Sequence, residues 1–291
     1  MTVAPVAARQ RGPAYFAWRR FAANKAAVVA GLVLVVLMLM AIFAPLITKT
    51  GPSDQDFLTQ ALAFPSRNFW FGIDDLGRDF FTRIVYGARV SLTIGFTAAA
   101  FSVLIGIPLG AVAGYYGGRA DWVVMRLIEL FSVVPPLLAA MLLGALTTGG
   151  FFTIVLIAAL FGWVQVCLLV RTQVKAFKEK EFVRAAAALG ATPGYIIRRH
   201  LIPNSVSPII VGFVLAIPLA MMLEASLSFL GIGVPPPTPS WGQMINTGMN
   251  FMYFYWHMAV YPTAALAITV LATTLFGDGL RDALDPTLKG R

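Results

Sequence analysis

Long segments without any charged residue dominate this sequence. No charge occurs between Glu129 and Arg171, and none occurs between Glu224 and Asp278. A helix needs about 20 apolar residues to cross the hydrocarbon core of a bilayer, so each segment is long enough to cross at least once. Only 12% of the residues are charged and 58% are hydrophobic, whereas a soluble domain is about 25% charged. The chain is therefore predicted to be an integral membrane protein.

The spacing of charges, glycines and prolines predicts an all-α protein with six transmembrane helices. The run from Thr147 to Gly150 divides the segment after Glu129 into two spans, because its two threonines are followed by two glycines. Prolines inside three of the spans are expected to kink them, at Pro108, Pro135-Pro136 and Pro218. The expected spans are 26–48, one within 90–118, and about 122–146, 151–170, 205–230 and 258–276.

Basic residues set the orientation. Cytoplasmic loops carry the excess of Lys and Arg, and all but five of the 22 Lys and Arg residues fall on the side of the N-terminus. Both termini are therefore expected in the cytoplasm, and the net charge of +9 reflects topology and not nucleic-acid binding. The expected parts are cytoplasmic segments 1–25 and 281–291, an external loop 49–89 with a short helix, and a five-helix core 90–280 with a cytoplasmic loop 171–204 and an external loop 231–257.

The cytoplasmic loop has a more structured pattern than a plain connection. Glu181 to Leu189 favours a helix with four consecutive alanines, and Gly190 suits the left-handed residue that ends it. Thr192 and Pro193 fit the start of a second short helix, which is expected to end before Pro203. Two capped helices and a nearly flat alanine face predict a docking surface for another protein, with an ordinary linker helix as the alternative.

The same loop resembles the coupling loop of ATP-binding-cassette importer permeases. The resemblance lies in the small residues Ala185 and Ala186, followed by Gly190 and then Pro203. Arg184 stands where this family usually has an acidic residue, and Glu181 lies one turn upstream and could substitute. In such importers the short helix sits in a groove of the ATPase, so the resemblance implies that these six residues form the ATPase contact.

Three further stretches are similar to the dipeptide/oligopeptide branch of that family, and to its second permease subunit. They are FGIDDLGRDFFTRIVYGARVSL (71–92), EASLSFLGIGVPPPTPSWGQMI (224–245) and GDGLRDALDPTL (277–288). The resemblance implies a peptide permease of the bacterial cytoplasmic (inner) membrane, surrounded by lipid and performing no bond chemistry. Nickel, glutathione or another small solute is the alternative cargo.

The resemblance also implies a set of partners. They are a homologous permease subunit, two cytoplasmic ATPase subunits, and an extracytoplasmic solute-binding protein. ATP and Mg²⁺ would be bound by the ATPases, and this chain would hold no cofactor. Consistent with that division, the phosphate-binding pattern Gly-x-x-x-x-Gly-Lys-Ser/Thr does not occur in the sequence.

Glu224 is the one carboxylate deep in the fifth and sixth apolar stretches. Ionisable groups at such depth face a bundle interior or a water-filled cavity. Glu224, with Ser226 and Ser228, is therefore expected either to line a translocation path or to make a structural hydrogen bond. An ion-coupled secondary transporter, the rival class, would carry several intramembrane carboxylates or internal repeats.

Smaller patterns give further expectations. A polar elbow that starts an external helix is predicted by Asp74, Asp75, Arg78 and Asp79, with Gly77 among them and Asp75 as the cap. Trp241 belongs to the uncharged, aromatic external loop.

Two patterns concern helix packing and ion pairing. Gly106, Gly110 and Gly114 fall four apart, which permits close helix packing within this subunit or against its partner. Arg126 and Glu129, three apart, predict an ion pair near the cytoplasmic interface.

Overall fold

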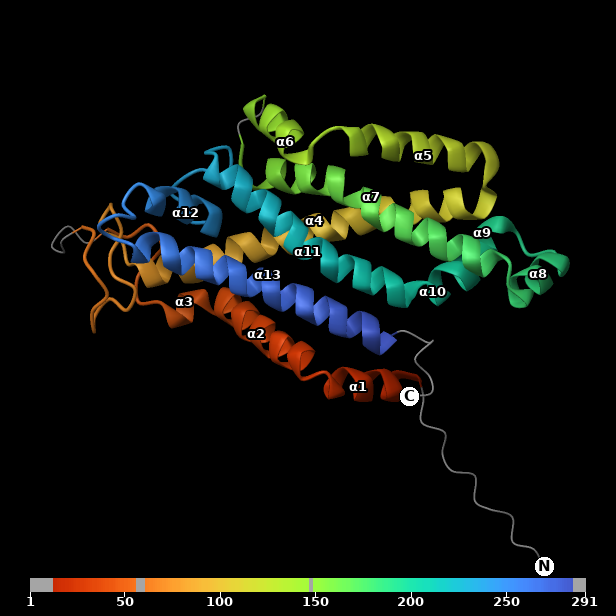
Figure 1. Cartoon of the computed structure of the whole chain (residues 1–291), viewed down its shortest axis with the longest axis horizontal. Helices are drawn as coiled ribbons and strands as arrows, with labels where there is room; N and C mark the ends of the chain where they lie inside the picture. Colours follow the sequence, from red (N-terminus) through yellow and green to blue (C-terminus); the bar gives the residue numbers. More distant parts are fainter. Residues whose placement is uncertain (1–12, 56–60, 147–148, 285–291) are drawn as a thin grey trace, which may run out of the picture.

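The computed structural model describes residues 13–55, 61–146 and 149–284, which form a bundle of long helices (Figure 1). Residues 1–12 and 285–291 of the predicted cytoplasmic ends, and Thr147 and Thr148 at the predicted break, lie outside this description. Four long helices make the body of the bundle: α4 (Phe80–Tyr116), α7 (Phe151–Lys178), α11 (Val206–Phe229) and α13 (His257–Leu284).

Shorter elements flank the body and close its two ends. One flank holds α1 (Pro13–Ala23), α2 (Lys25–Ile42) and α3 (Ala44–Ile47), and the other holds α5 (Gly118–Val133) and α6 (Pro136–Ala145). At one end lie α8 (Glu181–Ala188), α9 (Pro193–Ile196), a π-helical turn (Ile197–Leu201) and α10 (Ile202–Asn204). At the opposite end lies α12 (Trp241–Met249).

Within the described residues, five helices are long and apolar enough to cross a membrane: α2, α4, α7, α11 and α13. The third predicted span, about 122–146, is divided into α5 and α6, which meet at an angle of 80°. Pro135 and Pro136 explain this break, because proline lacks an N–H and disfavours helical backbone in the residue before it. The all-α fold with six crossings is confirmed if α5 and α6 count as one crossing. The kink expected at Pro135-Pro136 is a sharp break between two helices. Pro108 and Pro218 instead lie inside single helices.

The second span begins earlier than predicted, at Phe80. The Asp79 side chain caps this helix by accepting a hydrogen bond from the Thr82 amide at 3.1 Å. The prediction of Asp75 as the cap is therefore wrong, and the short helix expected within 49–89 is the first part of α4. Arg83 and Arg89 lie inside α4, so charge alone misplaced its start.

Glycines let α4 and α7 pack closely within the subunit. A β-carbon on Gly110 would lie 2.5 Å from the Cys167 carbonyl oxygen, and one on Gly114 would lie 2.8 Å from the Arg171 carbonyl oxygen. Gly106 faces α7 in the same way, because a β-carbon there would lie 2.7 Å from the Val166 β-carbon. The four-residue glycine spacing therefore serves contact inside this chain, which settles the choice left open by the sequence.

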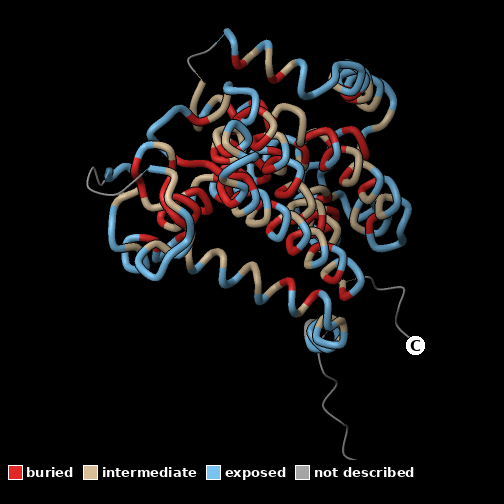
Figure 2. Tube along the Cα trace, turned by 60° about the vertical axis from the view of Figure 1, so that its left-hand side comes forward, coloured by how far each residue is buried: buried red, intermediate tan, exposed pale blue. Residues whose placement is uncertain are grey.

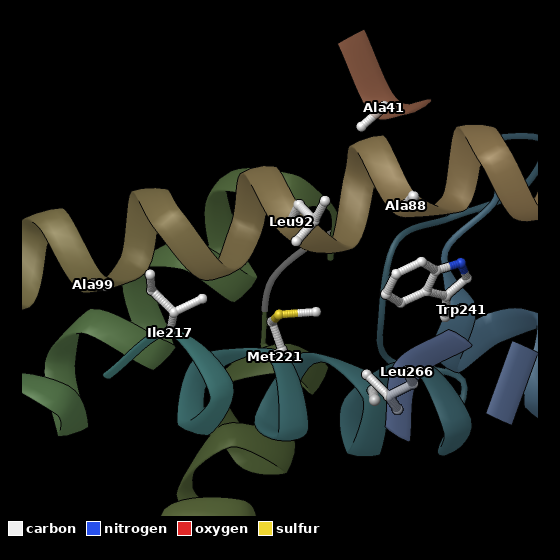
Figure 3. Close-up of a cluster of buried hydrophobic side chains, with 9 residues drawn as sticks. Ala41, Ala88, Leu92, Ala99, Ile217, Met221, Trp241 and Leu266 are labelled. Atoms are coloured by element: carbon white, nitrogen blue, oxygen red, sulfur yellow. The ribbon is translucent and has the colours of Figure 1, made fainter. Parts of the chain in front are cut away.

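The hydrophobic core lies where the long helices meet. Figure 2 shows buried residues concentrated in the middle of the bundle, with the flanking helices more exposed. One buried cluster joins α2, α4, α11, α12 and α13 around Trp241, Met221 and Leu92 (Figure 3). Trp241 is fully buried and its indole N–H donates to the Ile84 carbonyl at 3.0 Å. Trp241 therefore fixes α12 on α4 and is not an exposed loop residue.

Candidate functional site

The cytoplasmic loop is anchored to the bundle by one face of its helices. Val183 of α8 is buried in a cluster with Val174 of α7, Ile196 and Leu201. Ala186 packs against the same cluster. The α8 helix is thus held against the end of α7 and against α9, with its other face directed away from them.

The end of α8 has the backbone geometry that the sequence predicted. Gly190 has φ +86°, and the amides of Gly190 and Ala191 donate to the carbonyls of Ala187 and Ala186 at 3.0 and 3.1 Å. These two bonds satisfy the last carbonyls of the helix. Thr192 then caps α9 by accepting from the Tyr195 amide, with Pro193 at the start of that helix.

The sequence predicted that the second helical segment ends before Pro203, but this prediction is wrong. The π-helical turn over 197–201 widens the helix, and the Ile202 amide donates to the Ile197 carbonyl. Pro203 lies in α10, directly after this turn. Helical backbone therefore continues to Asn204, close to the start of α11.

The free face of this loop is an exposed apolar patch. Leu189 is 89% exposed, Tyr195 54% and Phe182 41%, and Ala185 is exposed beside them. Large side chains exposed together in this way mark an interaction surface more often than isolated ones do. We call Phe182, Ala185, Leu189 and Tyr195 the docking patch.

Charged residues border the docking patch. Arg184 donates to Glu179 at 2.7 Å, with side chains 69% and 68% exposed. An ion pair this exposed contributes little to stability. Glu181 lies in the first turn of α8 and is exposed, so both charges are accessible next to the patch.

A cavity of about 1010 Å³ opens between α6, α7 and α11, with Ser102 of α4 in its wall. Most lining side chains are apolar, among them Phe161, Leu215 and Leu219. Ser226 lines it, as the sequence suggested for the path, but Glu224 and Ser228 are not among the lining residues.

Glu224 and Ser228 belong instead to a buried hydrogen-bond network. Glu224 is fully buried and accepts from Ser228 at 2.7 Å and from Ser91 of α4 at 3.2 Å. Ser240 donates to Ser228 at 3.3 Å, and the Trp241 amide donates to Ser91 at 3.4 Å. This arrangement matches the structural reading of Glu224, since the network joins α4, α11 and the start of α12.

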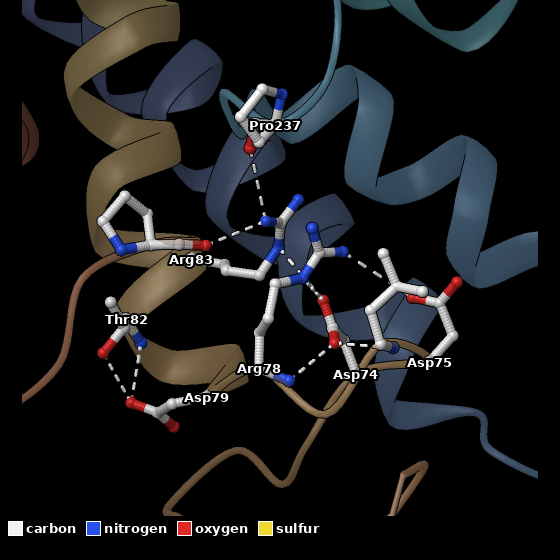
Figure 4. A network of polar contacts seen from close by, with 9 residues as sticks. Asp74, Asp75, Arg78, Asp79, Thr82, Arg83 and Pro237 are labelled. Atoms are coloured by element: carbon white, nitrogen blue, oxygen red, sulfur yellow. Dashed lines mark hydrogen bonds and ion pairs between the residues drawn. The ribbon is translucent and has the colours of Figure 1, made fainter. Parts of the chain in front are cut away.

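At the opposite end of the bundle, the predicted polar elbow is a compact charge cluster (Figure 4). The Asp74 carboxylate accepts from Arg78 Nε at 2.6 Å and lies 3.3 Å from Arg83 Nε. Arg83 also donates to the Pro52 carbonyl at 3.0 Å and the Pro237 carbonyl at 3.5 Å. The cluster therefore ties the loop before α4 to the loop before α12.

Two predicted elbow residues shape this turn. Gly77 has φ +76°, a left-handed conformation that favours glycine. Burial, followed by the neighbouring Asp74 carboxylate, raises the pKa of Asp75, while Arg78 opposes the shift. Sequence reasoning placed Asp74 in the elbow without identifying it as the centre of the cluster, and it missed Arg83, whose charge stands in the same stretch.

Among the described residues, no group of three or more His, Cys, Asp or Glu side chains could hold a metal ion. The predicted pair of Arg126 and Glu129 does form, on the exposed face of α5. What the site offers is a docking patch, a membrane-level cavity and a rigid external cap.

A bundle of membrane-spanning helices around a cavity, with an exposed apolar patch at one end, suits a permease subunit. A model of the family described as "Binding-protein-dependent transport system inner membrane component" matches residues 106–290. A second model, the N-terminal TM domain of oligopeptide transport permease C, matches residues 14–65. The chain belongs to the family of binding-protein-dependent inner-membrane permeases, and it is a multi-pass transport subunit of the bacterial inner membrane rather than an enzyme.

Curated relatives match over nearly the full chain. The oligopeptide transport system permease protein OppC of Bacillus subtilis (strain 168) is 41% identical over 270 residues, 93% of this chain and 88% of the relative. The dipeptide transport system permease protein DppC of the same organism is 42% identical over 274 residues, covering 94% and 85%. The glutathione transport system permease protein GsiD of Escherichia coli O157:H7 is 40% identical over 283 residues, covering 96% and 92%.

Solved structures agree on the fold. The inward-facing MetNI methionine ABC transporter aligns with a TM-score of 0.55 at 18% identity, covering 70% of this chain and 96% of that chain. The resemblance seen in the sequence, to the dipeptide/oligopeptide branch of importer permeases, is thus confirmed at the level of the family.

Proposed function

We propose that this chain imports di- or oligopeptides as one half of a two-permease translocation path, driven by separate ATPase subunits. The named substrates of the relatives, oligopeptides, dipeptides and glutathione, share amide bonds and support this cargo. Glutathione itself, or another small solute, is the alternative cargo of the same importer. The cavity between α7 and α11 supplies this chain's share of the path, with Ser226 in its wall.

The docking patch carries the coupling half of the proposal. Phe182, Ala185 and Leu189 expose apolar surface on a helix that is fixed to the bundle through Val183. A partner's groove would cover this surface, with Ala186 and Gly190 allowing close approach and Glu181 and Arg184 meeting charges at its edge. Pro203 would act indirectly, by shaping the helical connection to α11.

We assign each partner to a part of the molecule. Two ATPase subunits, which bind ATP and Mg²⁺, would serve the complex from the cytoplasmic end, one of them on the docking patch. A homologous permease would face the cavity. A solute-binding protein would dock at the opposite end, where Asp75, Gly77, Arg78 and Asp79 shape the surface and Trp241 holds it rigid.

Replacing Gly190 tests the docking proposal. Gly190 has φ +86° and open space around its missing β-carbon, and so does Gly231 (φ +80°) at the other end of the bundle. Gly190→Leu and Gly231→Leu therefore introduce similar local strain on opposite sides of the membrane. We expect only Gly190→Leu to abolish co-purification of the ATPase and its coupled hydrolysis. Normal ATPase binding and transport in Gly190→Leu would refute the proposal.

A further inference from the structure

We infer that Gln165 and Gln173 of α7 contact the peptide backbone during passage and make transport insensitive to the charge of the peptide's side chains. This inference rests on the proposed function, because it assigns residues within the same cavity. It concerns how the path treats its cargo, which neither the fold nor the docking patch determines.

The wall of the cavity carries no ionisable side chain among its described lining residues. Its polar members are two amides and three hydroxyls, from Gln165, Gln173, Ser102, Thr172 and Ser226. A wall without fixed charge neither holds nor repels a charged peptide strongly. Conduction through a pore requires such weak binding, because the solute must also leave.

The three hydroxyls are already engaged with their own helices. Ser102 donates to the Ala98 carbonyl at 2.9 Å, Thr172 to the Leu168 carbonyl at 2.9 Å, and Ser226 to the Met222 carbonyl at 2.8 Å. Each hydroxyl proton is used, so these groups offer a solute only acceptor capacity.

The two glutamine amides differ from the hydroxyls. Within the described part of the chain, neither Gln165 nor Gln173 makes a side-chain hydrogen bond; Gln165 is exposed and Gln173 is half-buried in the cavity wall. A glutamine side chain presents a carbonyl acceptor and an N–H₂ donor. That combination complements a peptide bond, which also offers one donor and one acceptor.

The spacing of the two amides suits a short peptide. Eight residues along a helix correspond to about 12 Å at about 1.5 Å per residue. An extended peptide covers about 3.3 Å per residue, so a peptide of about four residues spans both amides at once. A dipeptide would reach them one after the other.

The polarity of the wall also argues for a polar occupant. An amide placed against lipid or an apolar helix without a partner is costly to bury. A peptide backbone satisfies both amides whatever side chains it carries. The occupant that best fits two free amides in an otherwise uncharged, mainly apolar wall is therefore the peptide chain itself.

Isosteric substitutions in the assembled complex test this inference. Uptake of three tetrapeptides, neutral, lysine-containing and glutamate-containing, is measured in proteoliposomes with the partner permease, ATPases and binding protein present. We expect Gln165→Met and Gln173→Met to lower uptake of all three about fivefold each, the effect of one lost hydrogen bond. Gln165→Glu should instead slow the acidic peptide more than the basic one.

The outcomes separate the possibilities. Unchanged uptake in both Met variants, or an equal effect of Gln165→Glu on all three peptides, would overturn the inference. So would loss of the partner permease from purified Met variants, since the glutamines would then serve subunit contact. If the unmodified complex transports none of the three peptides, the proposed cargo is wrong. If the ATPase does not co-purify with the wild-type complex, the docking proposal is wrong, whatever the cargo.

Discussion

The Asp121 carboxylate at the start of α5 binds the Arg171 guanidinium of α7, with Arg171 Nη2 donating to Asp121 Oδ2 at 2.8 Å. Lys175 donates to the same oxygen at 2.7 Å. Arg171 and Lys175 lie in the last two turns of α7, directly before the loop that carries the docking patch. One carboxylate therefore links the outer helix α5 to the helix that leads into the cytoplasmic loop.

Asp121→Asn should loosen this link and destabilise the protein. Charge-assisted hydrogen bonds are stronger than neutral ones, so we expect a loss of about 1–3 kcal/mol in the free energy of unfolding. The matched control is Glu129→Gln, because Glu129 pairs with Arg126 on α5 with both side chains at least half exposed. The control should change stability by less than about 0.5 kcal/mol. Equal shifts in the thermal unfolding midpoints of the two variants would contradict this assignment.

Gly110→Ala should separate α4 from α7. The new methyl carbon would lie 2.5 Å from the Cys167 carbonyl oxygen, whereas in Gly212→Ala it would lie 3.8 Å from Leu169. Alanine favours helix over glycine by about 1 kcal/mol at both positions. Overpacking should outweigh this gain only at Gly110, with a net cost of about 1–3 kcal/mol. Thermal unfolding in detergent measures both, and a stable Gly110→Ala variant would show that the two backbones are not in tight contact.

Local patterns in the sequence predicted those features of the fold that depend on neighbouring residues. The caps at Gly190 and Thr192 and the break at Pro135-Pro136 follow from backbone conformations that few residues adopt. The start of α4 could not be placed in this way, because Arg89 bounds the uncharged stretch and Arg83 lies before it. Only the structure shows that Arg83 pairs with Asp74 and donates to two distant carbonyls. The link from Asp121 to Arg171 likewise depends on tertiary packing.

The same limit applied to the functional residues. Glu224 stood out as an intramembrane carboxylate, yet three serines around it were needed to show that it is sequestered within the fold. Gln165 was visible as an amide inside an uncharged span, and that signal could have identified it. Its place in a cavity wall, beside Gln173, required the pairing of α7 with α11.

Asp75→Asn should raise stability at neutral pH. Burial raises the pKa of Asp75 in the folded protein, so the folded state binds this proton more tightly than the unfolded state does. Ionised Asp75 therefore costs stability above its folded pKa, and the cost disappears as the pH falls below the unfolded pKa. The unfolding midpoint of the variant should exceed that of the wild type at pH 7, and the difference should shrink toward pH 4. A difference that stays constant over this range would contradict the sign or the origin of the shift.

Substitutions at Glu224 distinguish a structural role from one in transport. Ser228 and Ser91 donate to different oxygens of Glu224. Glu224→Gln keeps a carbonyl that can accept from Ser228 and places an N–H₂ that can donate to the Ser91 hydroxyl, whereas Glu224→Leu leaves both buried hydroxyls without a polar partner at this position. Each unsatisfied buried group costs about 1–3 kcal/mol, so the Leu variant should unfold at a clearly lower temperature and the Gln variant should be nearly as stable as the wild type. Because Glu224 is fully buried outside the cavity, peptide uptake by the Gln variant should also stay near the wild-type rate. The Gln variant could instead fold normally and assemble with its partners but no longer transport peptide. That result would place the carboxylate in the path, in a conformation where the network of Ser91, Ser228 and Ser240 has opened.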